Sequence, residues 1–133
     1  MIEIFVHKTD QRFFYTRLSG EVTIEYVDIW AEEFYKFVGE KKNCVVIQDY
    51  THAFLVDKNS NAKAAKVSKK IAHLLSDSVY VGLKGIQKFF FKLYIVLAPA
   101  KGFKRHIVNT TIEFEELFKV KFSDFERSFI YED

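Results

Sequence analysis

The chain has 133 residues, of which 49% are apolar and 29% are charged, and it carries a formal net charge of +2. That length suits one compact domain, and the composition excludes a disordered, collagen-like or disulfide-scaffold protein. Fifteen Phe, seven Tyr and one Trp are more aromatic mass than a domain of this size usually carries, so we expect some of it to cover a partner surface or a pocket.

The first segments predict two strands and a helix. Residues 2–6 and 13–18 are rich in β-branched and aromatic side chains, and the short link at 8–11 predicts an antiparallel hairpin between them. Thr23 then offers a helix N-cap, and the apolar residues that follow repeat with a helical period. That apolar face consists of Val27, Trp30, Ala31, Phe34, Phe37 and Val38.

The middle of the chain alternates short apolar strands with helices. Residues 44–48 form an unbroken apolar run, which is typical of a strand covered on both faces. A polar segment at 57–61 leads to a helix, and 79–81 predict a further strand, followed by a tight turn at Gly82 and Gly85. The helix that follows residues 57–61 has an apolar set made of Ala64, Val67, Ile71, Leu74 and Leu75.

The last third of the chain predicts two more helices around one strand. A helical stripe covers 86–97, and Pro99 ends it, because proline cannot continue a helix. Residues 105–109 predict a strand, and Thr110–Glu113 matches a helix capping box. Ser123–Glu126 repeats that capping pattern within an added C-terminal element, which carries three aromatic side chains on one side: Phe122, Phe125 and Phe129.

The order of these elements predicts an α/β fold, with a mixed, mainly parallel sheet of about five strands, an N-terminal hairpin and helices packed on the sheet. Repeats and linkers are absent from the sequence, so we expect a single domain over residues 1–133.

Cellular location is predicted from the cysteine content and the apolar runs. Cys44 is the only cysteine, which excludes an intramolecular disulfide. The first residues contain an acid and lack the basic region of a signal peptide. The longest apolar run, 93–100, is eight residues long, whereas a membrane span needs about 20. We therefore expect a cytoplasmic protein without a signal peptide or a transmembrane segment.

Charge is distributed unevenly along the chain. Residues 58–105 carry eleven basic side chains and a single acidic one, Asp77, whereas the segments before and after are each net acidic. Such a basic block attracts anions such as phosphates, lipid headgroups or an acidic protein. The alternative is that these lysines form the solvated backs of two helices, with acidic side chains of the flanking segments nearby.

Four local sequences, in this order, resemble a STAS domain, the fold of bacterial anti-sigma factor antagonists. They are 18–23 (LSGEVT), 45–49 (VVIQD), 79–85 (VYVGLKG) and 110–117 (TTIEFEEL). More closely, they are similar to small bacterial STAS-like proteins that share a likeness with CRAL-TRIO lipid-carrier domains. The resemblance covers a core at 11–119, with 120–133 as a C-terminal extension, and it implies a regulatory, non-enzymatic role through protein–protein contact.

In the antagonist family the central strand ends in an Asp, and a phosphorylatable Ser follows two residues later. Asp49 and Thr51 stand at those places here, so the resemblance implies a regulatory site at these two residues. A phosphate on Thr51 would add negative charge and disrupt an apolar docking face. The Gly-Leu pair that follows in the family is absent, and the alternative is that Thr51 is an ordinary cap or turn residue.

Catalytic, cofactor and metal motifs are absent from the sequence. The four histidines do not have the spacing of three or four converging zinc ligands. His52, beside Asp49 and Tyr50 at the carboxyl end of a central strand, is the best-placed candidate for chemistry, because open α/β sheets bind ligands there. No hydrolase elbow, phosphate loop or dinucleotide fingerprint accompanies it. We therefore expect no catalytic residue, cofactor or metal.

Residues 82–85 form a GxxG pattern, which KH modules use to clamp a nucleic-acid backbone. In KH modules the pattern joins two helices, whereas a strand precedes it here, and a tight strand-to-helix turn explains both glycines. We therefore expect no nucleic-acid partner.

The helix predicted at 86–97 is apolar on more than one face. If one side of this helix packs on the sheet, Phe91 and Ile95 remain exposed to solvent unless something else covers them. The buried side would then consist of Ile86, Phe90, Leu93 and Leu97. The cover is a protein partner, a second copy of the chain or a lipid surface. Alternatively, the C-terminal element with Phe122, Phe125 and Phe129 folds over this helix.

Two functions remain open at this point. We favour a non-enzymatic STAS-like regulatory domain that contacts a protein partner, or itself as a homodimer. The alternative is a small carrier that holds an apolar or anionic ligand, such as a lipid, in an aromatic-lined pocket. The residues expected at the ligand or partner surface are Tyr50, His52, Gly82, Gly85, Phe91 and Ile95.

Overall fold

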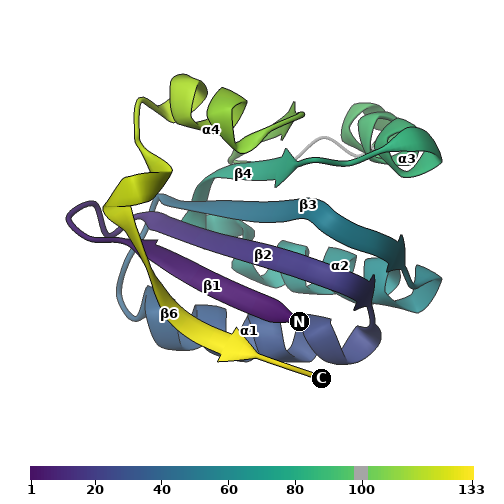
Figure 1. Ribbon diagram of the computed structural model, residues 1–133, viewed down its shortest axis with the longest axis horizontal. Helices are drawn as coiled ribbons and strands as arrows, with labels where there is room; N and C mark the ends of the chain where they lie inside the picture. Colours follow the sequence, from purple (N-terminus) through teal and green to yellow (C-terminus); the bar gives the residue numbers. More distant parts are fainter. Residues whose placement is uncertain (98–101) are drawn as a thin grey trace.

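The computed structural model describes residues 1–97 and 102–133, which form a six-stranded sheet with helices on both faces (Figure 1). The strands lie in the order β5-β4-β3-β2-β1-β6. Their bounds are β1 Ile2–His7, β2 Phe13–Val22, β3 Cys44–Val56, β4 Leu75–Val81, β5 Lys104–Val108 and β6 Phe125–Tyr131. The helices are α1 Ile24–Val38, α2 Lys58–Ile71, α3 Gly85–Leu97 and α4 Thr111–Phe118. Pro99 lies outside the described residues.

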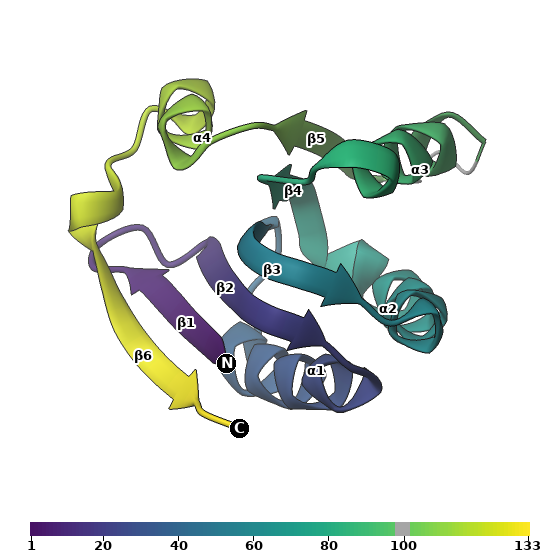
Figure 2. The ribbon, with the colours of Figure 1, turned by 45° about the vertical axis from the view of Figure 1, so that its right-hand side comes forward.

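The directions of the strands confirm the predicted α/β sheet. β2, β3, β4 and β5 are parallel neighbours, and β1 pairs antiparallel with β2 in the predicted hairpin. α1, α2 and α3 connect successive parallel strands and lie on one face, whereas α4 lies on the other (Figure 1 and Figure 2). Parallel strands require right-handed crossovers, and three crossovers in the same direction place their helices on the same side.

Aromatic side chains fill the space on both faces of the sheet. Under α1, whose predicted apolar stripe is largely buried, the ring of Phe14 lies 5.8 Å from that of Trp30. On the opposite face, α4 contributes Phe114, which is fully buried and lies 6.2 Å from Phe13 and 5.6 Å from Tyr15 between ring centroids. The two layers account for much of the large aromatic content.

β3 is longer than the sequence predicts. It continues from the expected 44–48 as far as Val56, because it stays paired with β2 across two register shifts. Residues 49–54 consequently lie within a strand and not in front of a helix. α2 begins after Asp57, whose carboxylate accepts a hydrogen bond from the Asn59 amide at 2.7 Å.

The C-terminal segment differs most from expectation. The second capping pattern, at 123–126, predicts a helix start, but only a short 3-10 turn spans Phe122–Asp124, and 125–131 form β6. β6 pairs antiparallel with β1, whose edge would otherwise carry unpaired backbone groups. Phe122 and Phe125 pack on the α4 face, whereas Phe129, expected on the same side as them, packs on the α1 face. β6 lies at the edge of the sheet opposite β4 and β5, so this element does not cover α3. The sheet has six strands as a result, one more than expected.

Within 1–97 and 102–133, every helix falls short of the length and apolar character that a membrane crossing requires.

Candidate functional site

The middle of β3 presents two different surfaces, because successive side chains of a strand point to opposite faces of a sheet. Asp49 lies on the α4 side, where it meets Tyr15 of the second aromatic layer, and Thr51 bonds to it there. Gln48 and Tyr50 lie on the side of α1 and α2. The two surfaces hold most of the site residues that the sequence predicts.

Asp49 is a buried carboxylate, 2% exposed, and is held by several donors. It accepts hydrogen bonds from the Tyr15 hydroxyl at 2.6 Å, from the Thr51 backbone amide at 2.9 Å and from the Thr51 hydroxyl. The Nε atom of Arg17 lies 3.9 Å from this carboxylate and adds opposite charge. Burial, and then the charge of Asp49, raises the pKa of Tyr15 far above its ordinary value, so Tyr15 remains a donor.

Thr51 also supports the loop that leads into α3. The Lys84 ammonium donates a hydrogen bond to the Thr51 carbonyl oxygen at 3.3 Å. Gly82 has a φ of +74°, and a Cβ at this position would overlap the Thr51 hydroxyl and lie 2.9 Å from its backbone nitrogen. Only glycine combines this conformation with so close an approach. We call this unit of Asp49, Thr51, Gly82 and Lys84 the Thr51 site.

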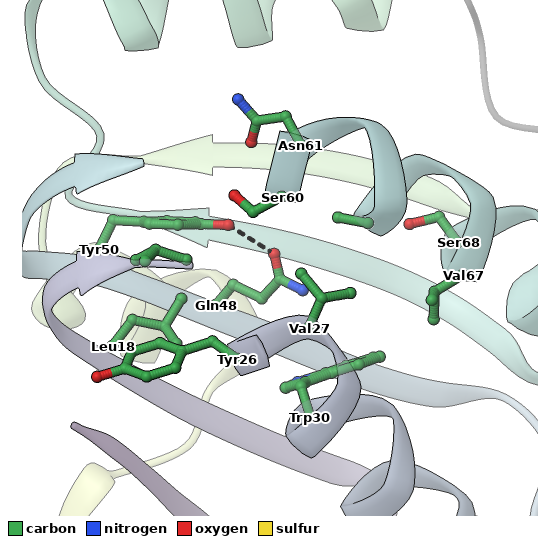
Figure 3. Close-up of a pocket in the computed structure, with 12 residues that line it drawn as sticks. Leu18, Tyr26, Val27, Trp30, Gln48, Tyr50, Ser60, Asn61, Val67 and Ser68 are labelled. Carbon is green, nitrogen blue, oxygen red and sulfur yellow. Dashed lines mark hydrogen bonds between the residues drawn. The ribbon is translucent and has the colours of Figure 1, made fainter. Parts of the chain in front are cut away.

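A half-open cavity lies on the other face of the sheet, between α2 and β3 (Figure 3). It has two compartments of about 50 and 210 Å³, of which the smaller reaches α1 at Trp30 and the larger extends below α3. Five residues line both compartments: Gln48, Tyr50, Asn61, Ala64 and Ser68.

Tyr50 forms the centre of this cavity. Its hydroxyl donates to the Gln48 carboxamide oxygen at 3.1 Å, the bond dashed in Figure 3. Burial raises the pKa of Tyr50 far above its ordinary value, so its hydroxyl stays neutral. Phe91 lines the larger compartment, with its ring centroid 6.0 Å from that of Tyr50 and 5.0 Å from that of Tyr80.

α3 is turned the opposite way from the sequence-based expectation. Phe91, expected to need cover, packs inward, whereas Ile86, Phe90 and Leu93, expected to be buried, are 72%, 56% and 42% exposed. α3 is apolar on almost every side, so its own pattern does not determine which side packs, and contact with the two tyrosines below it does. The side chains of Ile95 and Leu97 lie outside the described part of the structure.

An exposed apolar stripe runs along α3, and we call it the α3 face. Its members recur at helical spacing on one side: Ile86, Phe89, Phe90, Leu93 and Val96. Phe54 of β3, which is 80% exposed, lines a shallow depression together with two of them. The sequence does not predict Phe54 as a surface residue of this strand, because the apolar run that indicates the strand ends at residue 48.

The predicted site residues fall into two groups and a remainder. Asp49, Thr51 and Gly82 meet in the Thr51 site, and Tyr50 and Phe91 meet in the cavity. His52 and Gly85 are exposed and belong to neither group. Among residues 1–97 and 102–133, no group of three or more His, Cys, Asp or Glu side chains is arranged so that it could hold a metal ion.

Comparison with known proteins identifies the fold. No family model and no curated protein matches the chain. An uncharacterized protein of the DUF3478 family with a SpoIIAA-like fold, from Shewanella loihica PV-4, has 15% identity and a TM-score of 0.60 over 78% of this chain and 84% of that chain. The anti-sigma factor antagonist SpoIIAA in its unphosphorylated form has 10% identity and a TM-score of 0.59 over 90% of this chain and 98% of that chain. The chain therefore has the STAS-like, SpoIIAA-like fold that its sequence predicts.

Proposed function

We propose that this chain is a non-enzymatic STAS-like regulatory domain that acts by binding a protein partner. The observation that carries this proposal is the α3 face, on a fold shared with an anti-sigma factor antagonist. Single apolar side chains on a protein surface need no explanation. A row of five on one helix is a contiguous patch, and such patches mark interaction sites.

The charges beside the α3 face favour an acidic partner. Lys84 and Lys92 are exposed next to the stripe, and the surrounding segment 58–105 contains one acidic residue, Asp77. If two copies met face to face here, their lysines would lie opposite one another, which disfavours a homodimer through this surface. A protein with an apolar ridge and flanking carboxylates satisfies both the apolar and the charged requirement.

A photo-crosslinking phenylalanine analogue at position 89 tests this proposal in the native cells. Phe89 is 61% exposed on the α3 face, and Tyr35 of α1, which is 49% exposed, provides the matched control position. We expect one defined protein to crosslink from position 89 and not from position 35, and Lys92→Glu to remove that product. Crosslinking only to lipid, only to a second copy, or equally from both positions would contradict the proposal.

We also propose Asp49 and Thr51 as the regulatory position of the domain. Thr51 contacts Gly82 and Lys84, which lead directly into α3. Negative charge added at Thr51 faces the buried Asp49 carboxylate, so it breaks their hydrogen bond and displaces the loop. The α3 face then moves although nothing on it is modified.

Thr51→Asp tests the regulatory role, with Thr51→Ser as the control that keeps the hydroxyl. We expect Thr51→Asp to reduce the crosslink from position 89 by at least about tenfold, an effect of roughly 1.4 kcal/mol, and Thr51→Ser to retain it. A Thr51→Asp variant that folds and crosslinks like the wild type would remove the regulatory role and leave the docking proposal in place.

A further inference from the structure

We propose that the cavity between α2 and β3 binds a small, neutral ring compound that carries an amide or hydroxyl group. Phe90 belongs both to the α3 face and to the lining of the larger compartment, so binding of a small molecule is tested on the chain alone, without a protein partner. The proposal starts from the half-open space between α2 and β3, because small-molecule sites are concave and lined mainly by apolar and aromatic side chains with a few polar groups.

The space exists because α2 turns short side chains toward β3. Ser60, Ala64 and Ser68 are spaced four residues apart on α2 and line the cavity together with Tyr50. Figure 3 shows Ser60 and Ser68 on this helix. A leucine at position 64 would occupy the space shared by both compartments. Position 64 carries an alanine in a chain that is otherwise rich in aromatic side chains. The cavity therefore has aromatic rings on one wall and short side chains on the other.

The size of the cavity suits a single ring with a substituent. Its larger compartment measures about 210 Å³, and an apolar cavity of about 150 Å³ is enough to take up benzene. Tyr50, Tyr80 and Phe91 provide ring surfaces there, against which a planar molecule packs by stacked or edge-on contacts.

The residues that line the cavity favour an uncharged ligand. Every described side chain that lines either compartment is uncharged. A carboxylate or phosphate placed here would lose its hydration without gaining a cation, which is unfavourable by several kcal/mol. The carboxamides of Gln48 and Asn61 and the hydroxyl of Ser68 offer neutral donors and acceptors instead. These features favour a neutral ligand over the anionic one that the sequence left open.

Benzamide and benzoate are the probes, because they share size and shape and differ in charge. Isothermal titration calorimetry measures the binding of each probe, whichever compartment the probe occupies. We expect benzamide to give a saturable heat of binding, and benzoate to bind at least about tenfold more weakly. No saturable response to benzamide, or an equal response to benzoate, would overturn the proposal.

Ala64→Leu fills the shared part of the cavity, and Ala62→Leu makes the same change at an exposed position of α2. We expect Ala64→Leu to weaken benzamide binding by at least about tenfold and Ala62→Leu to leave it unchanged. If thermal unfolding shows that Ala64→Leu does not fold, Ala65→Leu, which fills the larger compartment alone, gives the same comparison. Equal binding by the filled variant and the Ala62→Leu control would show that the probe binds elsewhere.

Discussion

Gly82 and Gly85 both adopt a positive φ, +74° and +56°, but their surroundings differ. A Cβ on Gly82 would overlap Thr51, whereas a Cβ on Gly85 would meet nothing within 4 Å. The pair therefore separates the strain of the backbone conformation from the close approach between the β4–α3 loop and β3.

We predict that Gly85→Ala lowers the free energy of unfolding by about 1–2 kcal/mol, which is the effect of the positive φ alone. Gly82→Ala carries the same strain and also forces the Thr51 backbone to move, so we expect a loss about 2 kcal/mol larger. Urea unfolding of both variants measures the difference. Equal losses would mean that Gly82 is not in close contact with Thr51.

Tyr15 supports the buried Asp49, and its removal has a pH-dependent effect. Tyr15→Phe leaves Asp49 with one donor fewer, and we expect the free energy of unfolding to fall by about 1–3 kcal/mol at neutral pH. Because burial and Asp49 raise the pKa of Tyr15 in the folded state, the stability it contributes is complete below the ordinary tyrosine pKa of about 10. This contribution to stability is lost as the pH rises from the ordinary tyrosine pKa toward the raised pKa that Tyr15 has in the folded state.

The difference in unfolding free energy between wild type and Tyr15→Phe should therefore shrink as the pH rises above about 10. Chemical denaturation across the alkaline range measures it. A constant difference would show that the Tyr15 hydroxyl has the same pKa in the folded and the unfolded chain, and a difference that grows with pH would show that its pKa is lower in the folded chain.

At the level of elements, the sequence predicts those whose own pattern is unambiguous. α1 has one apolar stripe and one charged face, so its position and buried side follow from periodicity alone. α3 is apolar around most of its circumference, so its existence is predictable and its orientation is not. β6 carries a local capping pattern, but the open edge of β1, far away in the sequence, determines its conformation.

The candidate site divides in the same way. Asp49 and Thr51 lie two residues apart, so a local motif identifies them together. The contact of Thr51 with Gly82 depends on the pairing of β3 with β4, which no local pattern contains. The cavity depends on small side chains of α2 that face Tyr50. In a sequence, small residues on a helix do not distinguish a cavity wall from an exposed helix surface.

β6 offers a direct test of the C-terminal segment. Phe125 is buried, with its ring centroid 5.9 Å from Phe13 and 6.0 Å from Tyr15, whereas Ile130 on the same strand is 38% exposed. We predict that Phe125→Ala lowers the free energy of unfolding by about 3 kcal/mol or more and that Ile130→Ala costs less than about 1 kcal/mol. Thermal or urea unfolding distinguishes the two, and a small effect of Phe125→Ala would place β6 outside the cooperative core.

For the whole molecule, the net charge of +2 conceals a basic block at 58–105 between two acidic segments. The block includes α2 and α3, so the positive charge lies near the α3 face. The acidic partner that we propose would therefore be attracted at long range before the apolar stripe makes contact, and raising the salt concentration should slow its association.

The affinity of the protein crosslinked at position 89 tests the docking role most directly. That protein is titrated against the wild-type chain, Phe89→Ser and the control Tyr35→Ser, both of which remove an exposed ring from a helix. We predict that Phe89→Ser weakens binding by at least about tenfold and that Tyr35→Ser changes it by less than about twofold. Equal affinities of wild type and Phe89→Ser, or an equal loss in both variants, would contradict docking on the α3 face.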